Sequence, residues 1–117
     1  MKLDSVGLIV NYKKEKTRKT ACRIIDWLNS KKIKVYIEGN KGKEIGKEEL
    51  NCPTEKFLKN VDLLISLGGD GTLLRAARLV AAEDIPIFGV NLGGLVFQTQ
   101  IGIDDLEKSL EKQYQQR

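Results

Sequence analysis

Four short apolar runs are spaced along the chain, at residues 6–10, 34–37, 61–67 and 85–90. They are rich in β-branched side chains, and the longer runs are continuous rather than alternating between apolar and polar positions. Such runs are typical of strands buried on both faces of a parallel sheet. The pattern therefore predicts four strands.

Helical patterns separate these runs. From about Thr17, apolar side chains recur at the spacing of one helix face; they are Ala21, Ile24, Ile25 and Leu28. Thr54 is predicted to cap a short helix that ends near Asn60, and a mostly buried helix is expected over 72–82. The polar, glycine-containing segment 38–49 is predicted to be a mobile loop.

A last helix is expected over 104–117, because Asp104 and Glu107 are spaced as a capping box. Strands therefore alternate with helices, which predicts an α/β fold: a Rossmann-like, three-layer domain with a mainly parallel sheet. In such a sheet every strand-to-helix loop lies at the carboxyl edge, where open α/β sheets bind ligands. Three unusual segments are expected to meet there, namely 13–19, 68–72 and 91–94.

The length and composition of the chain limit the class of protein and the kinds of active site that are possible. The 117 residues are the size of one domain, and no apolar run approaches the roughly 20 residues of a membrane helix. Without a signal-peptide core we expect a cytoplasmic protein, with Cys22 and Cys52 as unpaired thiols. The absence of histidine excludes a Ser-His triad and a histidine metal site.

Segment 13–19 holds five cations against one glutamate, which equals the net charge of +4. Such a local excess favours an anionic ligand over a nucleic acid, for which interleaved aromatic residues are also missing. The alternative is a solvated start of a helix.

The sequence Gly-Gly-Asp-Gly-Thr at 68–72 is the sharpest signal. Glycines between a buried strand and a helix expose backbone N–H groups beside a helix N-terminus, where a phosphate can approach closely. The candidate phosphate-binding residues are Gly68, Gly69, Gly71 and Thr72. The alternative is a tight turn with Asp70 or Thr72 as a helix cap.

Three polar residues near this loop are candidates for chemistry. Asp70 can accept a proton from a substrate hydroxyl, orient that hydroxyl, or hold Mg²⁺ through water. Arg75 falls in the first turn of the expected helix, where an anion beside it would relieve the dipole conflict, so it is a predicted ligand contact, whereas Arg78 is predicted to lie at the surface. Asn91 can contact a ligand or close its own turn.

The Gly-Gly-Asp-Gly-Thr loop and the Gly-Val-Asn-Leu-Gly motif at 89–93 together resemble the NAD kinase family, and the strand end at 9–11 agrees. The resemblance covers essentially the whole chain. It implies transfer of phosphate from ATP or polyphosphate to the adenosine 2′-hydroxyl of NAD, giving NADP, with a divalent metal, Mg²⁺ being expected. It also implies that Asp70 is the catalytic proton acceptor and that the dinucleotide contacts are Asp70, Gly71, Arg75, Asn91 and Phe97.

The chain departs from the family in two ways. Val96 and Gln98 stand where the family has Gly and Leu in Gly-Phe-Leu-Thr, which changes the pocket wall around Phe97. The resemblance also implies a second, β-rich domain, which we do not expect within these 117 residues. The expectation is an N-terminal nucleotide-binding domain, inactive alone, whose residues 104–117 lead to the missing domain of a homo-oligomeric parent.

Two other functions use the same loop. One is a lipid or sugar kinase, although no apolar segment suited to a membrane surface is evident. The other is a non-catalytic nucleotide-binding domain that keeps the fold, which the departures at Val96 and Gln98 would allow.

Overall fold

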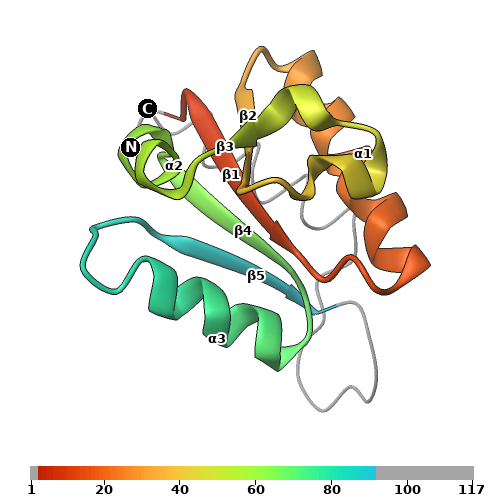
Figure 1. Cartoon of the computed structure of the whole chain (residues 1–117). Helices are drawn as coiled ribbons and strands as arrows, with labels where there is room; N and C mark the ends of the chain where they lie inside the picture. Colours follow the sequence, from red (N-terminus) through yellow and green to blue (C-terminus); the bar gives the residue numbers. More distant parts are fainter. Residues whose placement is uncertain (1–2, 92–117) are drawn as a thin grey trace.

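A computed structural model describes residues 3–91 as an open parallel sheet with helices on both faces (Figure 1). The strands are β1 (Ser5–Val10), β2 (Lys34–Glu38), β3 (Asn51–Cys52), β4 (Leu63–Gly68) and β5 (Ile87–Asn91). They lie in the order β3-β2-β1-β4-β5, and every pairing is parallel. The predicted α/β fold with a parallel sheet is confirmed, and β3 is a short strand that the hydrophobic pattern did not predict.

Helices form the two outer layers. Helix α1 (Glu15–Ser30) packs on one face, whereas α2 (Thr54–Asn60) and α3 (Asp70–Leu79) pack on the other. The three-layer arrangement explains the continuous apolar runs, since β1 and β4 are buried along their whole length. No helix within residues 3–91 is long and apolar enough to cross a membrane, and both cysteines are free thiols.

Strand β1 lies at the centre of the sheet and carries a glycine at a point of close packing. Leu8 faces the core beneath α1, whereas Ile9 faces the core beneath α2 and α3. A Cβ on Gly7 would lie 2.4 Å from Cζ of Phe57, the fully buried aromatic residue of α2. The helix can approach the sheet this closely only because residue 7 has no side chain.

The segment 38–49, predicted to be a mobile loop, has short elements of regular structure. The segment contains two 3₁₀ helices, η1 (Lys41–Ile45) and η2 (Glu48–Leu50). The Gly42 N–H donates to Asn51 Oδ1 at 2.7 Å, while Ile45 and Leu50 pack against the core beneath α1. A few buried contacts therefore order a stretch whose composition is typical of a loop.

The prediction that Thr54 caps α2 is also wrong. Pro53 occupies the N-cap position, and its carbonyl accepts the Phe57 N–H at 2.8 Å. Thr54 is the first helical residue, and its hydroxyl donates to Glu38 Oε2 at 2.5 Å. The side chain expected to serve its own helix therefore ties α2 to the end of β2.

Helix α3 begins at Asp70 rather than Thr72 and ends at Leu79. The expectation of a mostly buried helix is wrong, because Leu73 and Leu74 are 41% and 52% exposed. Ala76 is fully buried against the sheet. A helix that packs on one side only buries one stripe, however apolar its remaining positions are.

Candidate functional site

The carboxyl ends of β1, β4 and β5 meet at one edge of the sheet, as predicted. The Asn11 N–H donates to the Leu67 carbonyl at 2.9 Å, and Gly68 pairs with Asn91 in the β4–β5 register. The chain leaves β1 for α1 on one face and leaves β4 for α3 on the other. This divergence is the topological switch point at which open α/β sheets bind ligands.

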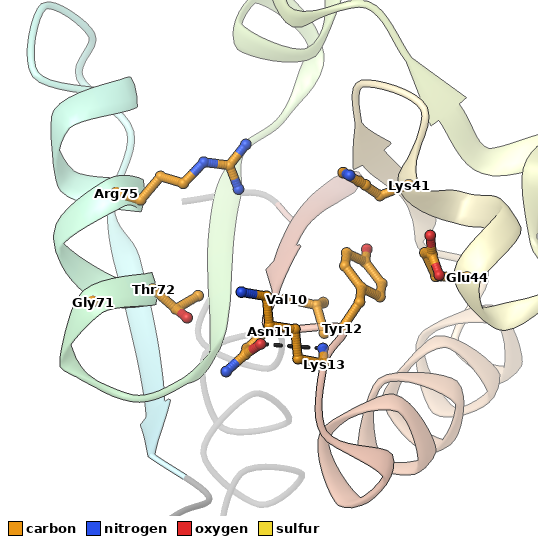
Figure 2. Close-up of a pocket in the computed structure, with 9 residues that line it drawn as sticks. All are labelled: Val10, Asn11, Tyr12, Lys13, Lys41, Glu44, Gly71, Thr72 and Arg75. Atoms are coloured by element: carbon orange, nitrogen blue, oxygen red, sulfur yellow. Dashed lines mark hydrogen bonds between the residues drawn. The ribbon is translucent and has the colours of Figure 1, made fainter.

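A cavity of about 530 Å³ opens at this switch point (Figure 2). Its walls come from the segment after β1, from η1 and from the first turns of α3. The lining residues are Val10, Asn11, Tyr12, Lys13, Lys41, Glu44, Gly71, Thr72 and Arg75. Three cationic side chains against one carboxylate give the cavity a positive potential, which suits an anionic ligand.

The glycines of the loop have different physical roles. Gly68 has a φ of +153°, and a Cβ there would lie 2.6 Å from Thr72 Oγ1 and 3.0 Å from Asn11 Cβ. Gly69 and Gly71 have no atom within 4 Å of an added Cβ. Gly68 is therefore required by the packing of the loop, whereas Gly71 leaves open space beside the cavity, as close approach of a ligand would need.

Asp70 is exposed and is the first residue of α3. Within residues 3–91 its carboxylate has no hydrogen-bond or ion-pair partner, and the N-cap residue is Gly69, without a side-chain cap. The alternative that Asp70 serves as the helix cap is thus not supported. Asp70 directly precedes Gly71 but does not itself line the cavity.

The basic segment 13–19 is divided among several contacts. Helix α1 starts at Glu15, so most of the segment forms the first turns of the helix and its lysines are exposed, in agreement with the alternative of a solvated helix start. Arg18 Nη1 donates to the Tyr12 carbonyl at 2.6 Å, and Lys19 pairs with Glu15 in an exposed i,i+4 bridge of 3.3 Å. Lys13 is the one member of the segment that lines the cavity.

A second lysine reaches the cavity from η1. Lys41 lies more than twenty residues beyond the basic segment, and only its place in a polar stretch after a strand could have pointed to it. The sequence suggested that the segment after β1 alone supplies the positive charge. In the structure Lys13 from that segment and Lys41 from the segment after β2 both line the cavity.

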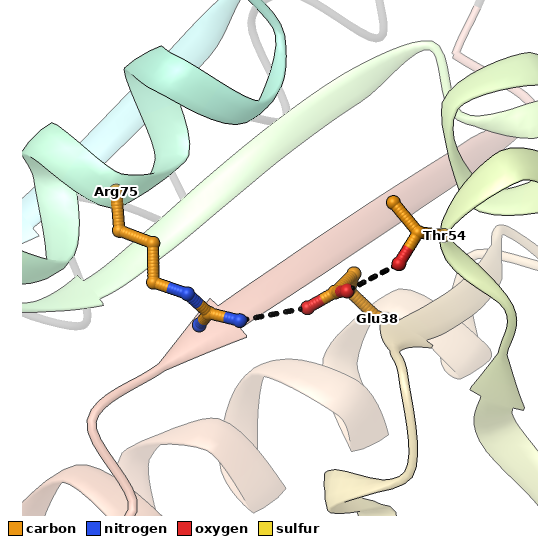
Figure 3. A network of polar contacts seen from close by, with 3 residues as sticks. All are labelled: Glu38, Thr54 and Arg75. Carbon is orange, nitrogen blue, oxygen red and sulfur yellow. Dashed lines mark hydrogen bonds and ion pairs between the residues drawn. The ribbon is translucent and has the colours of Figure 1, made fainter.

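Arg75 lines the cavity and is also held by an ion pair (Figure 3). Its Nη2 donates to Glu38 Oε1 at 2.9 Å, and the other oxygen of Glu38 accepts the Thr54 hydroxyl. The side chain of Glu38 is only 14% exposed, against 59% for Arg75. Sequence reasoning missed Glu38, because nothing local shows that the end of β2 faces a residue 37 positions further along.

Tyr12 contributes a phenol to the cavity wall, a role for which the sequence carries no signal. It does pack against the core beneath α1, but its hydroxyl is buried and has no hydrogen-bond partner among the described residues. Burial raises the pKa of Tyr12 to about 12; Arg75 opposes this shift, and Glu38 and Glu44 add to it. At neutral pH the phenol is therefore a protonated donor.

Replacing Tyr12 by Phe is expected to leave the free energy of unfolding unchanged or to raise it by up to about 1 kcal/mol, because it removes a buried hydroxyl that has no partner. Urea unfolding monitored by circular dichroism measures this. A loss of more than about 1 kcal/mol would show that the hydroxyl makes a stabilising contact.

The same variant has a pH signature. The pKa of the Tyr12 phenol rises from 10.0 to about 12 on folding. Below pH 10 the phenol is protonated in both the folded and the unfolded chain, so it adds no pH dependence. As the pH rises from 10 to about 12, the unfolded chain loses the proton first and the free energy of unfolding falls. Between these values the wild type should lose stability more steeply than Tyr12→Phe, with all other titrating groups shared by the two proteins.

Comparison with known proteins decides the family. The model of the ATP-NAD kinase N-terminal domain matches residues 6–117. The chain belongs to the NAD kinase family. An NAD kinase of Moorella thermoacetica is 41% identical over 110 residues, and one of Desulforamulus reducens is 38% identical over 109 residues.

The match covers only part of these relatives. The alignments span 94% and 93% of this NAD kinase domain but 35% and 38% of the two relatives. A crystal structure of yeast NADH kinase in complex with NADH has the same fold, with a TM-score of 0.84 at 20% identity. That comparison covers 100% of this chain and 39% of the yeast protein.

Several predicted features of the NAD kinase domain lie outside the described residues. These are Phe97, its neighbours Val96 and Gln98, and the helix expected over 104–117. Asn91 is placed by its backbone beside Gly68. Within residues 3–91 no group of three or more His, Cys, Asp and Glu side chains is arranged to hold a metal ion. The loop 68–72 itself contains one carboxylate, that of Asp70.

Proposed function

We propose that the chain is the N-terminal half of an enzyme that phosphorylates the adenosine 2′-hydroxyl of NAD, with ATP or polyphosphate as the donor. The observation that carries this proposal is one juxtaposition. Asp70, an exposed carboxylate without a hydrogen-bond or ion-pair partner among residues 3–91, directly adjoins a cationic cavity at the switch point of an NAD kinase domain. Phosphoryl transfer needs both an acceptor for the hydroxyl proton and cations for the phosphate oxygens.

The loop after β4 separates two approaches to Asp70. On the side of β1 lies the cavity, where Lys13, Lys41 and Arg75 can neutralise a chain of phosphates. On the side of β5 lies Asn91, whose backbone is paired with Gly68. We therefore assign the phosphate donor to the cavity and the ribose of NAD to the β5 side, with Phe97 as a further contact to NAD.

In this arrangement the Asp70 carboxylate accepts the proton of the 2′-hydroxyl. The 2′-oxygen forms a bond to the terminal phosphorus of the donor, and the bond from that phosphorus to the bridging oxygen breaks. With ATP the leaving group is ADP, whose new charge the cavity cations and the Gly71 N–H stabilise. The Tyr12 hydroxyl is a neutral donor without a partner in the described part of the chain, and it is a further contact for a phosphate oxygen.

A divalent metal fits this site as a companion of the donor phosphates. Mg²⁺ commonly binds through one or two carboxylates, substrate phosphates and water, and Asp70 supplies one exposed carboxylate. Mg²⁺ there would neutralise charge on the transferring group. The chain's own residues bind the phosphates, receive the proton and orient the two substrates.

The proposal also predicts that the isolated domain binds nucleotide without turning it over. The 117-residue chain should bind ATP with Mg²⁺ in a calorimetric titration yet form no NADP, because it spans only 35% of the length of its relative from Moorella thermoacetica. The full-length protein should form NADP in an enzyme-coupled assay. NADP formation by the isolated chain would overturn its predicted inactivity.

A different result with the full-length protein would overturn the proposed function itself. Phosphorylation of a lipid or a sugar with NAD left unchanged would assign the loop to another kinase reaction. Nucleotide binding without any phosphoryl transfer would identify a non-catalytic domain.

A further inference from the structure

The ion pair between Glu38 and Arg75 spans the switch point. Glu38 is the last residue of β2, and Arg75 lies in α3, which follows β4. Strand β1 lies between β2 and β4 in the sheet, so the two side chains meet above β1. The pair thus links the end of β2 to helix α3, beside the cavity that Arg75 lines.

The two partners are anchored very differently. The Glu38 side chain is 14% exposed and is held at both oxygens, by Arg75 Nη2 at 2.9 Å and by the Thr54 hydroxyl at 2.5 Å. Arg75 is 59% exposed, and a long, exposed arginine retains many rotamers unless something fixes it. Glu38 is the rigid member, and Thr54 fixes its orientation.

The pair also leaves part of the guanidinium available. Among residues 3–91, Nη2 is the one Arg75 nitrogen that has a partner. A guanidinium carries five N–H donors in a planar fork, so the remaining donors can face an oxyanion while Nη2 stays on Glu38. Figure 2 shows the guanidinium extending from α3 toward the side of the cavity formed by Lys41 and Tyr12.

We propose that Glu38 is a positioning residue, which pre-orients Arg75 to receive the phosphate chain of an anionic ligand in the cavity. The proposal rests on the proposed function and adds to it a residue that does not itself touch the ligand. Fixing the guanidinium before binding lowers the entropy that the ligand must remove, so the advantage appears as tighter binding.

The direction in which Glu38→Gln changes the dissociation constant of an anion distinguishes this positioning role from a purely electrostatic effect. Glu38 is negatively charged and close to the cavity, so removal of its charge alone should tighten the binding of an anion. If Glu38 positions Arg75, Glu38→Gln should weaken binding instead. The amide keeps the size of the side chain and an oxygen for the Thr54 hydroxyl, but it no longer provides a carboxylate for Arg75.

The test is calorimetric titration of the 117-residue chain with inorganic tripolyphosphate at constant ionic strength. Glu38→Gln is expected to raise the dissociation constant by about 3- to 10-fold. Arg75→Gln should raise it further, and in that background Glu38→Gln should have no effect or tighten binding. A parallel titration with ATP shows which part of a nucleotide is affected. An equal loss of affinity for ATP and for tripolyphosphate assigns the effect to the phosphate chain.

Glu44→Gln is the matched control. Glu44 lines the same cavity but forms no hydrogen bond or ion pair with Arg75, so loss of its charge should tighten tripolyphosphate binding. Thr54→Val is the second variant, in case Glu38→Gln unfolds. It removes the hydroxyl that orients Glu38, and a smaller loss of affinity in the same direction is expected.

The outcomes that contradict the proposal are distinct. Equal or tighter binding by Glu38→Gln and Thr54→Val, both folded by circular dichroism, would overturn the positioning role and leave the proposed function intact. No tripolyphosphate or ATP binding by the wild type at millimolar concentration would overturn the anion site, and the role of Glu38 with it.

Discussion

Asp70→Asn is expected to lower kcat for NADP formation by roughly 10²- to 10⁴-fold in the full-length protein that carries this domain. The amide cannot accept the proton of the 2′-hydroxyl, so the attacking oxygen is no longer activated. Because Asp70 is exposed and its carboxylate has no hydrogen-bond or ion-pair partner among residues 3–91, the substitution should leave the fold unchanged. Steady-state kinetics with NAD and ATP as varied substrates measures kcat and KM separately.

Asp84→Asn is the matched control for this effect. Asp84 is an exposed carboxylate beyond the end of α3, remote in sequence from the loop, and its loss should change neither constant. If Asp70→Asn raises KM for NAD while kcat stays within a few-fold of wild type, Asp70 orients the ribose but does not accept the proton. Unchanged kinetics would exclude both roles.

Gly7→Ala is expected to destabilise the domain by at least about 1–3 kcal/mol. Its methyl group would lie 2.4 Å from Phe57 Cζ and 2.6 Å from Cε1, inside a fully buried ring contact. Both β1 and α2 are fixed by further packing, so relief requires movement of the helix. The free energy of unfolding from urea titrations of the two proteins gives the difference.

Gly71→Ala provides the comparison for the glycine-to-alanine change itself. An added Cβ at Gly71 meets no atom within 4 Å, and alanine favours a helix, so stability should be unchanged or slightly raised. The double variant Gly7→Ala with Phe57→Leu should be less destabilised than the sum of the two single changes, because the smaller side chain relieves the clash. Strict additivity would show that Phe57 is not the residue in conflict.

The elements that the sequence predicted well are those with a strong periodic signal. The apolar runs at β1 and β4 are buried on both faces, and their length and β-branching distinguished them from helices. Ala21, Ile24, Ile25 and Leu28 of α1 are all buried, as the helical spacing predicted. Strand β3 was missed because Asn51 and Cys52 are too short a segment to carry a period.

Predictions that failed depended on neighbours distant in the chain. Thr54 has the residue type of a helix cap, but its hydroxyl donates to Glu38 at the end of β2. The segment 38–49 has the composition of a loop, yet η1 and η2 are ordered by contacts with the core. The burial of α3 was overestimated, because apolar composition does not tell how many sides of a helix another element covers.

The sequence by itself determined the α/β fold, the convergence of the loops at one sheet edge, and the glycine loop with Asp70 at its centre. The strands and helices follow from the period of the apolar residues, which is a local property of the sequence. The position of the loops at one edge follows from the order of these elements and the right-handed crossover rule. Only the tertiary structure decided which charges meet at the cavity. Lys41 lines the cavity together with Lys13, the Tyr12 hydroxyl has no hydrogen-bond partner within residues 3–91, and Glu38 holds Arg75. Side-chain partners across a sheet depend on register and on the packing of helices, and no spacing along the chain encodes these.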